Sequence, residues 1–276
     1  MIQDIAPHKF HNEYRSDAAP VDESPVLCFD GRKMLVKLTE GAFIFPTYAQ
    51  LRGPEGLVFA FAVDETEYFL DISENARTLE GFEYRDLFEL RRGAGNVYGM
   101  IMFTGYHLAS WYKDNAFCGR CGGKAVHNDH ERAMHCPHCN RNIYPRIMPA
   151  VIVGVTDGER LLVTQYRDHR GFFALIAGFV EIGETLEETV AREVMEETGL
   201  RVKNITYYKS QPWGTENDIL TGFYCEADGN DEIVLDRNEL RLAQWRLPEE
   251  IELQPDSFSL TNEMMLMFKE HGVFWK

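Results

Sequence analysis

The chain has 276 residues, of which 45% are hydrophobic and 12% aromatic, so it is long enough for one or two domains with their own cores. Its formal net charge of −16 argues against a protein that holds nucleic acid by general phosphate neutralisation, because that mode needs a basic surface. It has no long apolar run and no basic segment followed by a short apolar one. We therefore expect no membrane span and no secretory signal, and a cytoplasmic protein.

The first part of the chain, residues 1–112, is predicted to form a mostly β domain. Short apolar segments such as Val26–Phe29 and Leu57–Val63 alternate with turn signals that contain glycine and acidic residues. Two helices are expected, over Tyr84–Leu90 and Leu108–Asp114. No catalytic combination of side chains can be identified in this part from the sequence alone.

Two Cys-x2-Cys pairs lie in the next segment, residues 113–146. Fourteen residues separate the first pair from the second, and the four cysteines are Cys118, Cys121, Cys136 and Cys139. This spacing predicts a tetrahedral zinc site, and in a cytosolic chain a structural metal is favoured over disulfides. Four thiolates leave no open position for water, so the zinc is expected to be structural rather than catalytic.

The rest of the chain, residues 147–276, has strand-like segments on both sides of one long motif. Ala150–Val155 and Leu161–Tyr166 are joined by an Asp-Gly turn, which favours a hairpin. Later in the chain we expect three strands and a terminal helix, at Ile205–Ser210, Thr221–Glu226, Gln244–Leu247 and Asn262–His271. Mixed strands around a central helix predict an α/β/α sandwich, so the whole chain is expected to be an α+β protein.

The long motif, Gly178–Leu200, is predicted to contain a loop and a helix. It follows a strand expected over Phe172–Gly178. Thr185 and Glu188 have the spacing of a capping box, so the helix is expected to begin there, and Gly199 is expected to end it.

This helix places carboxylates beside its own apolar face. On a helical wheel Glu197 falls between Leu186 and Val190, while Glu193 and Glu196 lie toward the edge of that face. An acidic run on a helix is usually a solvated face. A carboxylate directed toward a core is costly, however, unless a cation or hydrogen bonds compensate it. Hard oxygen ligands grouped in this way suit Mg²⁺ or Mn²⁺.

The motif matches all nine fixed positions of the Nudix box, G-x5-E-x7-R-E-U-x-E-E-x-G-U, in which U is aliphatic. The matching residues are Gly178, Glu184, Arg192, Glu193, Val194, Glu196, Glu197, Gly199 and Leu200. After the box comes the segment Ser210-Gln211-Pro212-Trp213. With the four-cysteine ribbon, these motifs resemble the NADH pyrophosphatase (NAD⁺ diphosphatase) family of zinc-ribbon-containing Nudix hydrolases over essentially the whole chain.

The resemblance implies roles for individual residues. Catalytic divalent ions, Mg²⁺ or Mn²⁺, would be bound by the Ala177 carbonyl, Glu193, Glu197 and Glu239. Three further members of the catalytic group would be Glu196, which assists, Arg192, which holds the carboxylates of the box in place, and Glu184, which stabilises the loop or a water molecule behind the metal ligands. The substrate would be contacted by Tyr144, Glu131, Gln211, Pro212, Trp213 and Ser259.

The resemblance also implies an activity. The expected activity is hydrolysis of the pyrophosphate bond of NAD(H) to nicotinamide mononucleotide and AMP by a homodimer, and removal of NAD caps from RNA is a further expected activity. The family pattern continues Pro-Phe-Pro-x-Ser after the tryptophan, whereas residues 214–218 read Gly-Thr-Glu-Asn-Asp. Because the missing aromatic would help to stack a base, one alternative is a Nudix hydrolase that prefers ADP-ribose or another nucleoside diphosphate derivative. The second alternative is a non-catalytic module whose ribbon contacts nucleic acid or a protein.

Overall fold

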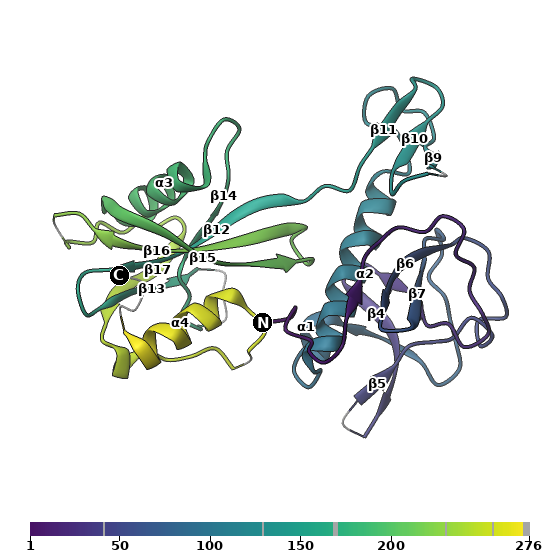
Figure 1. The fold of residues 1–276 in the computed structure, drawn as a ribbon, viewed down its shortest axis with the longest axis horizontal. Coiled ribbons are helices and arrows are strands. Elements are labelled where there is room, and N and C mark those ends of the chain that lie inside the picture. The colour runs from purple at the N-terminus through teal and green to yellow at the C-terminus, as the bar shows by residue number, and fades with distance from the viewer. Residues whose placement is uncertain (41, 129, 168–170, 230, 256, 273–276) are drawn as a thin grey trace. The chain divides into compact units, whose positions relative to one another are not determined.

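The chain folds into two compact units in the computed structural model (Figure 1). The structure describes residues 1–276 except 41, 129, 168–170, 230, 256 and 273–276. The N-terminal unit contains residues 3–146 and 214–217, and the C-terminal unit contains residues 1–2, 147–213 and 218–276.

Among its described residues, the N-terminal unit contains two four-stranded sheets. The first has the strand order β1-β6-β7-β2, with bounds Phe10–His11, Leu57–Val63, Thr66–Asp71 and Val26–Leu27. In the second, β4 pairs with β3, β5 and β8, and the bounds of β3, β4, β5 and β8 are Phe29–Asp30, Lys33–Thr39, Ala42–Ile44 and Glu83–Asp86. The expected β character of this part of the chain is therefore confirmed.

The first helix predicted in this unit is partly wrong. The segment from Tyr84 is not helical at its start, because β8 pairs there with β4. Helix α1 covers only Leu87–Leu90, and Asp86 caps it by accepting a hydrogen bond from the Phe88 N–H at 2.9 Å. Pairing with a neighbouring strand has overridden the local helical pattern.

The second helix is longer than predicted. Helix α2 spans Asn96–Asp114, whereas the sequence pattern indicated a start at Leu108. Glycines in its first half lower helix propensity and obscure the pattern. Gly105 is needed for packing, because a Cβ there would lie 2.7 Å from Cδ1 of Leu27 in β2. None of the helices in the described part of the chain is both long enough and apolar enough to cross a membrane.

The ribbon contributes a small sheet to the same unit. Its order is β11-β10-β9, with bounds Arg141–Ile143, Met134–Cys136 and Val126–His127. Both pairings in this sheet are antiparallel.

A six-stranded mixed sheet organises the C-terminal unit. Its order is β15-β16-β12-β13-β17, and β14 pairs with β12. In chain order, β12 to β17 have the bounds Met148–Thr156, Leu161–Tyr166, Ile176–Phe179, Val202–Trp213, Asp218–Ala227 and Leu240–Arg246. The helices are α3 (Leu186–Thr198), the short 3₁₀ turn η1 (Pro248–Glu250) and α4 (Leu260–His271). Strands β12 and β16 run parallel, and the other pairs are antiparallel.

The predicted elements of this unit are confirmed, with different ends. Strands β15 and β16 are longer than the predicted ranges Ile205–Ser210 and Thr221–Glu226, because the two strands pair with each other along most of their length. Strand β14 begins at Ile176, later than the predicted start at Phe172. Before it, Ala174 makes a single bridge to Thr164.

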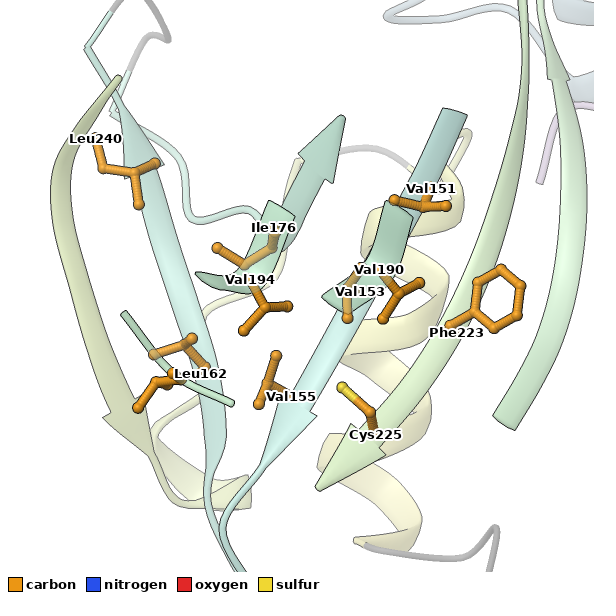
Figure 2. Close-up of a cluster of buried hydrophobic side chains, with 11 residues drawn as sticks. Val151, Val153, Val155, Leu162, Ile176, Val190, Val194, Phe223, Cys225 and Leu240 are labelled. Carbon is orange, nitrogen blue, oxygen red and sulfur yellow. The ribbon is translucent and has the colours of Figure 1, made fainter. Parts of the chain in front are cut away.

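Each face of the sheet is covered by one helix. Val190 and Val194 of α3 pack with alternate residues of β12, Val151, Val153 and Val155 (Figure 2). Residues of α4 pack on the opposite face, around the intervening residues of the same strands. Because successive strand side chains point to opposite faces, one sheet supports both cores, and the α/β/α sandwich is confirmed.

Candidate active site and zinc centre

Helix α3 begins and ends where the sequence predicts. The Thr185 hydroxyl accepts a hydrogen bond from the Glu188 N–H at 3.2 Å, and the Glu188 carboxylate accepts one from the Thr185 N–H at 2.8 Å. Gly199 follows the last turn with a φ of 70°, a left-handed conformation that glycine adopts without strain. These two ends fix which residues of α3 face the sheet.

Two carboxylates of α3 are buried. The relative exposure is 9% for Glu193 and 1% for Glu197, whereas the Glu196 side chain is 58% exposed. Val190 and Val194 pack against the sheet, and their register turns Glu193 and Glu197 inward as well. This arrangement agrees with the helical wheel.

Glu193 lies against strand β14. A Cβ on Gly178 would come within 2.0 Å of the Glu193 carboxyl carbon, so only glycine leaves room for this side chain. Oε1 of Glu193 accepts a hydrogen bond from Nη1 of Arg192 at 2.7 Å. Burial raises the pKa of Glu193, and the hydrogen bond from Arg192 opposes that rise.

Glu197 is held by a tyrosine hydroxyl. Tyr166 Oη lies 3.1 Å from Oε1 and 3.3 Å from Oε2 of Glu197. Burial is the main cause that raises the pKa of Glu197 to about 8, and the charges of Glu193 and Glu239 add to the rise. The hydrogen bond from Tyr166 lowers this pKa but does not restore its ordinary value.

The backbone of Ala177 meets the same hydroxyl. The Ala177 N–H donates to Tyr166 Oη at 2.9 Å, and the Ala177 carbonyl oxygen lies 3.5 Å from it. The structure therefore brings together Ala177 and Glu197, both of which the resemblance implies as metal ligands. Tyr166 lies outside the box, and motif matching misses it. The strand alternation that puts Leu162 and Tyr166 on the face covered by α3 could have indicated it.

Arg192 connects the loop before α3 with carboxylates on the helix. Its Nε and Nη2 donate to the two oxygens of Glu184 at 2.6 and 2.9 Å, a bidentate pairing. Nη2 also donates to the Phe179 carbonyl at 3.0 Å, and Nη1 donates to Glu196 at 3.0 Å. The hydrogen bonds from Arg192 lower the pKa of Glu184 to about 2.

Glu239 approaches from the loop before β17. This loop is attached to the end of α3, because the Val234 N–H donates to the Thr198 carbonyl at 2.8 Å and the Asp236 N–H donates to the Glu197 carbonyl at 3.0 Å. Glu239 itself is exposed. Its charge contributes to the raised pKa of both buried carboxylates.

The chemistry of this group fits a hard divalent cation. Two carboxylates are buried beside one guanidinium and one hydroxyl, so that their ionised forms are only partly compensated in an environment of low dielectric constant. A divalent cation would compensate that charge, and oxygen atoms are its preferred ligands. The residues that could hold it are Glu193, Glu197, Glu239 and the carbonyl of Ala177.

The Ser-Gln-Pro-Trp segment ends strand β15, and its glutamine is engaged within the fold. Gln211 is fully buried: Nε2 donates to the Phe258 carbonyl at 2.6 Å, and Oε1 accepts from the Leu260 N–H at 2.7 Å. Ser259, between these two residues, caps α4 by accepting from the Asn262 N–H at 3.1 Å. Gln211 and Ser259 are thus brought together at the start of α4.

The other substrate-contact candidates are more accessible. Pro212 is exposed and Trp213 is partly buried. In the N-terminal unit, Tyr144 is 55% exposed and its hydroxyl donates to Oε1 of Glu131 at 2.8 Å. Asn142 donates to the same oxygen at 3.1 Å. Tyr144 and Glu131 therefore form one hydrogen-bonded pair.

Four sulfur atoms converge in the ribbon. The ligand atoms of Cys118, Cys121, Cys136 and Cys139 all lie within 4.8 Å of one another. Sγ distances are 3.7 Å for Cys118 and Cys139 and 3.5 Å for Cys121 and Cys136. Zinc–sulfur bonds of about 2.3 Å in a tetrahedron separate the sulfurs by about 3.8 Å, so this spacing fits zinc.

The backbone forms tight turns around the cysteines, and it suits a thiolate at Cys118. Gly122 and Asn140, which follow the second cysteine of each pair, have φ of 71° and 53° and form tight turns. Hydrogen bonds from the backbone N–H groups of Arg120 and Cys121 lower the pKa of Cys118 to about 6. A lowered thiol pKa favours the thiolate, which is the form that binds zinc.

Family profiles match the ribbon and the C-terminal domain. A family profile described as NUDIX domain matches residues 146–265, and one described as NADH pyrophosphatase zinc ribbon domain matches residues 113–144. The chain is similar to the NAD-capped RNA hydrolase NudC of Klebsiella pneumoniae, with 45% identity over 174 residues that cover 62% of this chain and 67% of the relative.

One further curated relative and one solved structure are similar over shorter stretches. With the NAD-capped RNA hydrolase NudC of Shigella flexneri, identity is 44% over 152 residues, which cover 55% of this chain and 59% of the relative. The chain thus spans 59–67% of the length of these curated relatives. A crystal structure of a NUDIX hydrolase from Nitrosomonas europaea has a TM-score of 0.49 and 23% identity, covering 56% of this chain and 90% of that one.

The sandwich, the capped box helix and its inward carboxylates define a Nudix hydrolase domain. The four-cysteine ribbon that precedes this domain is a feature of one family within the Nudix hydrolases. The chain belongs to the NADH pyrophosphatase family of zinc-ribbon-containing Nudix hydrolases. The resemblance inferred from the motifs is confirmed, and the ribbon supports a structural zinc.

We expect Gly178→Ala to lower metal-dependent hydrolysis by about 100-fold, because the added methyl group would displace the Glu193 carboxylate and a misplacement of about 1 Å can cost that much. Steady-state turnover, with NADH as the test substrate, measures this effect. Gly93→Ala is the matched control, since nothing lies within 4 Å of a Cβ there. Equal turnover of Gly178→Ala and wild type would contradict the geometry of Glu193.

Cys136→Ser should release zinc and lower the melting temperature, because bound zinc contributes on the order of 10 kcal/mol to a small ribbon. Zinc content per chain is measured by atomic absorption. Cys28→Ala, at a buried cysteine outside the cluster, should keep its zinc. Full zinc content in Cys136→Ser would show that the four sulfurs are not a zinc site.

Proposed function

We propose that the protein hydrolyses the pyrophosphate bond of NAD(H), giving nicotinamide mononucleotide and AMP, with Mg²⁺ or Mn²⁺ as the catalytic ion. The observation that carries this proposal is the pair of buried carboxylates, Glu193 and Glu197, beside the Ala177 backbone. Membership of the NADH pyrophosphatase family supports the choice of a dinucleotide substrate.

The residues of the site would have two roles, binding the metal ions and holding the metal ligands in position. Glu193, Glu197, Glu239 and the Ala177 carbonyl would hold the divalent ions. When bound, such ions polarise phosphate oxygens, lower the pKa of water and neutralise the charge that develops during displacement. Arg192 keeps Glu193 in place through a hydrogen bond of 2.7 Å.

Glu184, in the loop before α3, and Glu196, on the exposed side of α3, would support this arrangement. Glu184 pairs with Arg192 through both carboxylate oxygens and accepts a further hydrogen bond from Thr189 Oγ1 at 2.8 Å. This fixes the guanidinium, so the same side chain can hold Glu193 and Glu196. Both oxygens of Glu184 are occupied, which favours a positioning role for this residue over proton transfer.

The proposed substrate contacts are those that the family resemblance implies, taken residue by residue. We propose that Tyr144 and Glu131 take part from the ribbon, and that Pro212 and Trp213 take part from the end of β15, where Trp213 could stack a base or nicotinamide ring. Gln211 and Ser259 would act through the backbone they hold, since the amide of Gln211 is engaged within the fold.

Several features of the whole protein belong to the same proposal. We propose three domains, with residues 1–112 as an N-terminal domain, residues 113–146 as the zinc ribbon and residues 147–276 as the Nudix domain. We also propose a cytoplasmic homodimer. Because the relatives are named NAD-capped RNA hydrolases, an NAD cap on RNA is proposed as a further substrate.

A second candidate rests on residues 214–218. The sequence Gly-Thr-Glu-Asn-Asp lacks the aromatic residue that follows Trp213 in the family pattern. Weaker stacking there would favour ADP-ribose or another nucleoside diphosphate derivative.

A substrate panel separates these candidates. Turnover of NADH, NAD⁺, ADP-ribose and NAD-capped RNA is compared with Mg²⁺ and with Mn²⁺. We expect the highest kcat/KM for a substrate that carries nicotinamide. A clear preference for ADP-ribose would replace our choice with the second candidate, and hydrolysis of no substrate with either ion would favour a non-catalytic binding module.

Glu197→Gln should lower NADH turnover by more than about 100-fold, since losing a charged ligand costs more than losing a residue that supports one, for which 10–100-fold is usual. The fold should persist, because glutamine has nearly the same shape and removes a buried charge. Turnover and melting temperature are measured together. The matched control is Glu187→Gln, the same change at an exposed position of α3. Near-normal turnover in Glu197→Gln would refute its assignment.

A further inference from the structure

One hydroxyl group joins three elements of the Nudix domain. Tyr166, at the end of β13, places its Oη 2.9 Å from the Ala177 nitrogen in β14 and 3.1 Å from Glu197 Oε1 in α3. The carbonyl oxygens of Leu175 and Ala177 lie farther away, at 3.4 and 3.5 Å. The two shortest contacts therefore reach the backbone of one implied metal ligand and the side chain of another.

The proton of this hydroxyl has a defined direction. A tyrosine hydroxyl has one proton to donate, and it can also accept hydrogen bonds. The Ala177 N–H can only donate, so Oη accepts that bond. The proton is then available for Glu197, whose ionised carboxylate can only accept and whose Oε1 lies nearer to Oη than the carbonyl oxygens of Leu175 and Ala177 do. Tyr166 thus stabilises the charged form of a carboxylate that is almost completely buried.

We propose that Tyr166 is a positioning residue of the divalent-cation site. Its hydroxyl fixes the Ala177 peptide and the Glu197 carboxylate relative to each other before the ion binds. The inference deepens the proposed function, because it concerns the same site. Its own test, however, reads metal binding directly and does not require the substrate to be known.

The position of Tyr166 in the strand explains why one side chain can do this. Leu162 and Tyr166 both belong to the core that α3 covers, so the ring enters the interior from the sheet. Strand β13 changes its pairing register with β17 between Gln165 and Tyr166, so Tyr166 lies at an irregular end of the strand. A phenylalanine ring would fill the same space in the core. The metal site therefore requires the hydroxyl and not the ring.

The test compares the removal of two tyrosine hydroxyl groups from the same domain. Tyr166→Phe removes the hydroxyl at the site. Tyr224→Phe is the matched control: Tyr224 is fully buried on the other face of the sheet, and its hydroxyl donates to the Met264 carbonyl at 2.7 Å. Mn²⁺ binding to each purified chain is measured by calorimetry and by electron paramagnetic resonance, with the melting temperature recorded alongside.

We expect Tyr166→Phe to weaken Mn²⁺ binding by about 10-fold or more, the usual effect of removing a residue that orients a metal ligand. Tyr224→Phe should lower the melting temperature and leave Mn²⁺ binding unchanged. With NADH, Tyr166→Phe should require more Mn²⁺ for half-maximal rate and should keep its KM for NADH at saturating Mn²⁺. In a Glu197→Gln background, Tyr166→Phe should weaken Mn²⁺ binding by a smaller factor than in the wild-type background, because the hydroxyl then positions only the Ala177 peptide against a charged ligand set.

Several results would overturn the inference. They are wild-type Mn²⁺ affinity in Tyr166→Phe, equal weakening in Tyr224→Phe, or failure of Tyr166→Phe to fold, which would assign the hydroxyl to stability. The proposed function fails in a different way. A wild-type protein that binds Mn²⁺ but hydrolyses no dinucleotide would refute it, and weaker binding by Tyr166→Phe would still support the positioning role.

Discussion

The burial of two carboxylates on the inner side of helix α3 is the constraint on which the rest of the site depends. Glu193 and Glu197 are turned toward the sheet by the same register that packs Val190 and Val194 into the core. Burying a carboxylate is costly unless a cation or hydrogen bonds compensate it. The surrounding residues supply part of that compensation, through Arg192 on one side and Tyr166 on the other, and a divalent ion would supply the rest.

Two kinds of metal chemistry are separated along this chain. The ribbon offers four sulfur atoms at the spacing of a closed tetrahedron, which suits a structural zinc ion. The candidate ligands at helix α3 are oxygen atoms of carboxylates and of one backbone carbonyl, which suit Mg²⁺ or Mn²⁺. Because thiolates are soft ligands and carboxylates are hard ligands, the two sites are expected to bind different ions.

Much of the Nudix domain could be predicted because its signals are local. The capping residue Thr185, the left-handed Gly199 and the apolar stripe between them act within one helix, and the structure has them as expected. What the sequence did not reveal depends on contacts between distant segments. Strand pairing replaced the start of a predicted helix at Tyr84, packing against a strand requires the Gly105 that obscured helix α2, and Tyr166 reaches Glu197 from another element.

The most direct measurement is the anomalous scattering of a crystal of the protein soaked with Mn²⁺. Bound Mn²⁺ should give a strong peak beside Glu193 and Glu197, within bonding distance of their carboxylate oxygens and of the Ala177 carbonyl. A crystal without a peak at this position, in which both carboxylates point to bulk solvent, would contradict a divalent-cation site on helix α3.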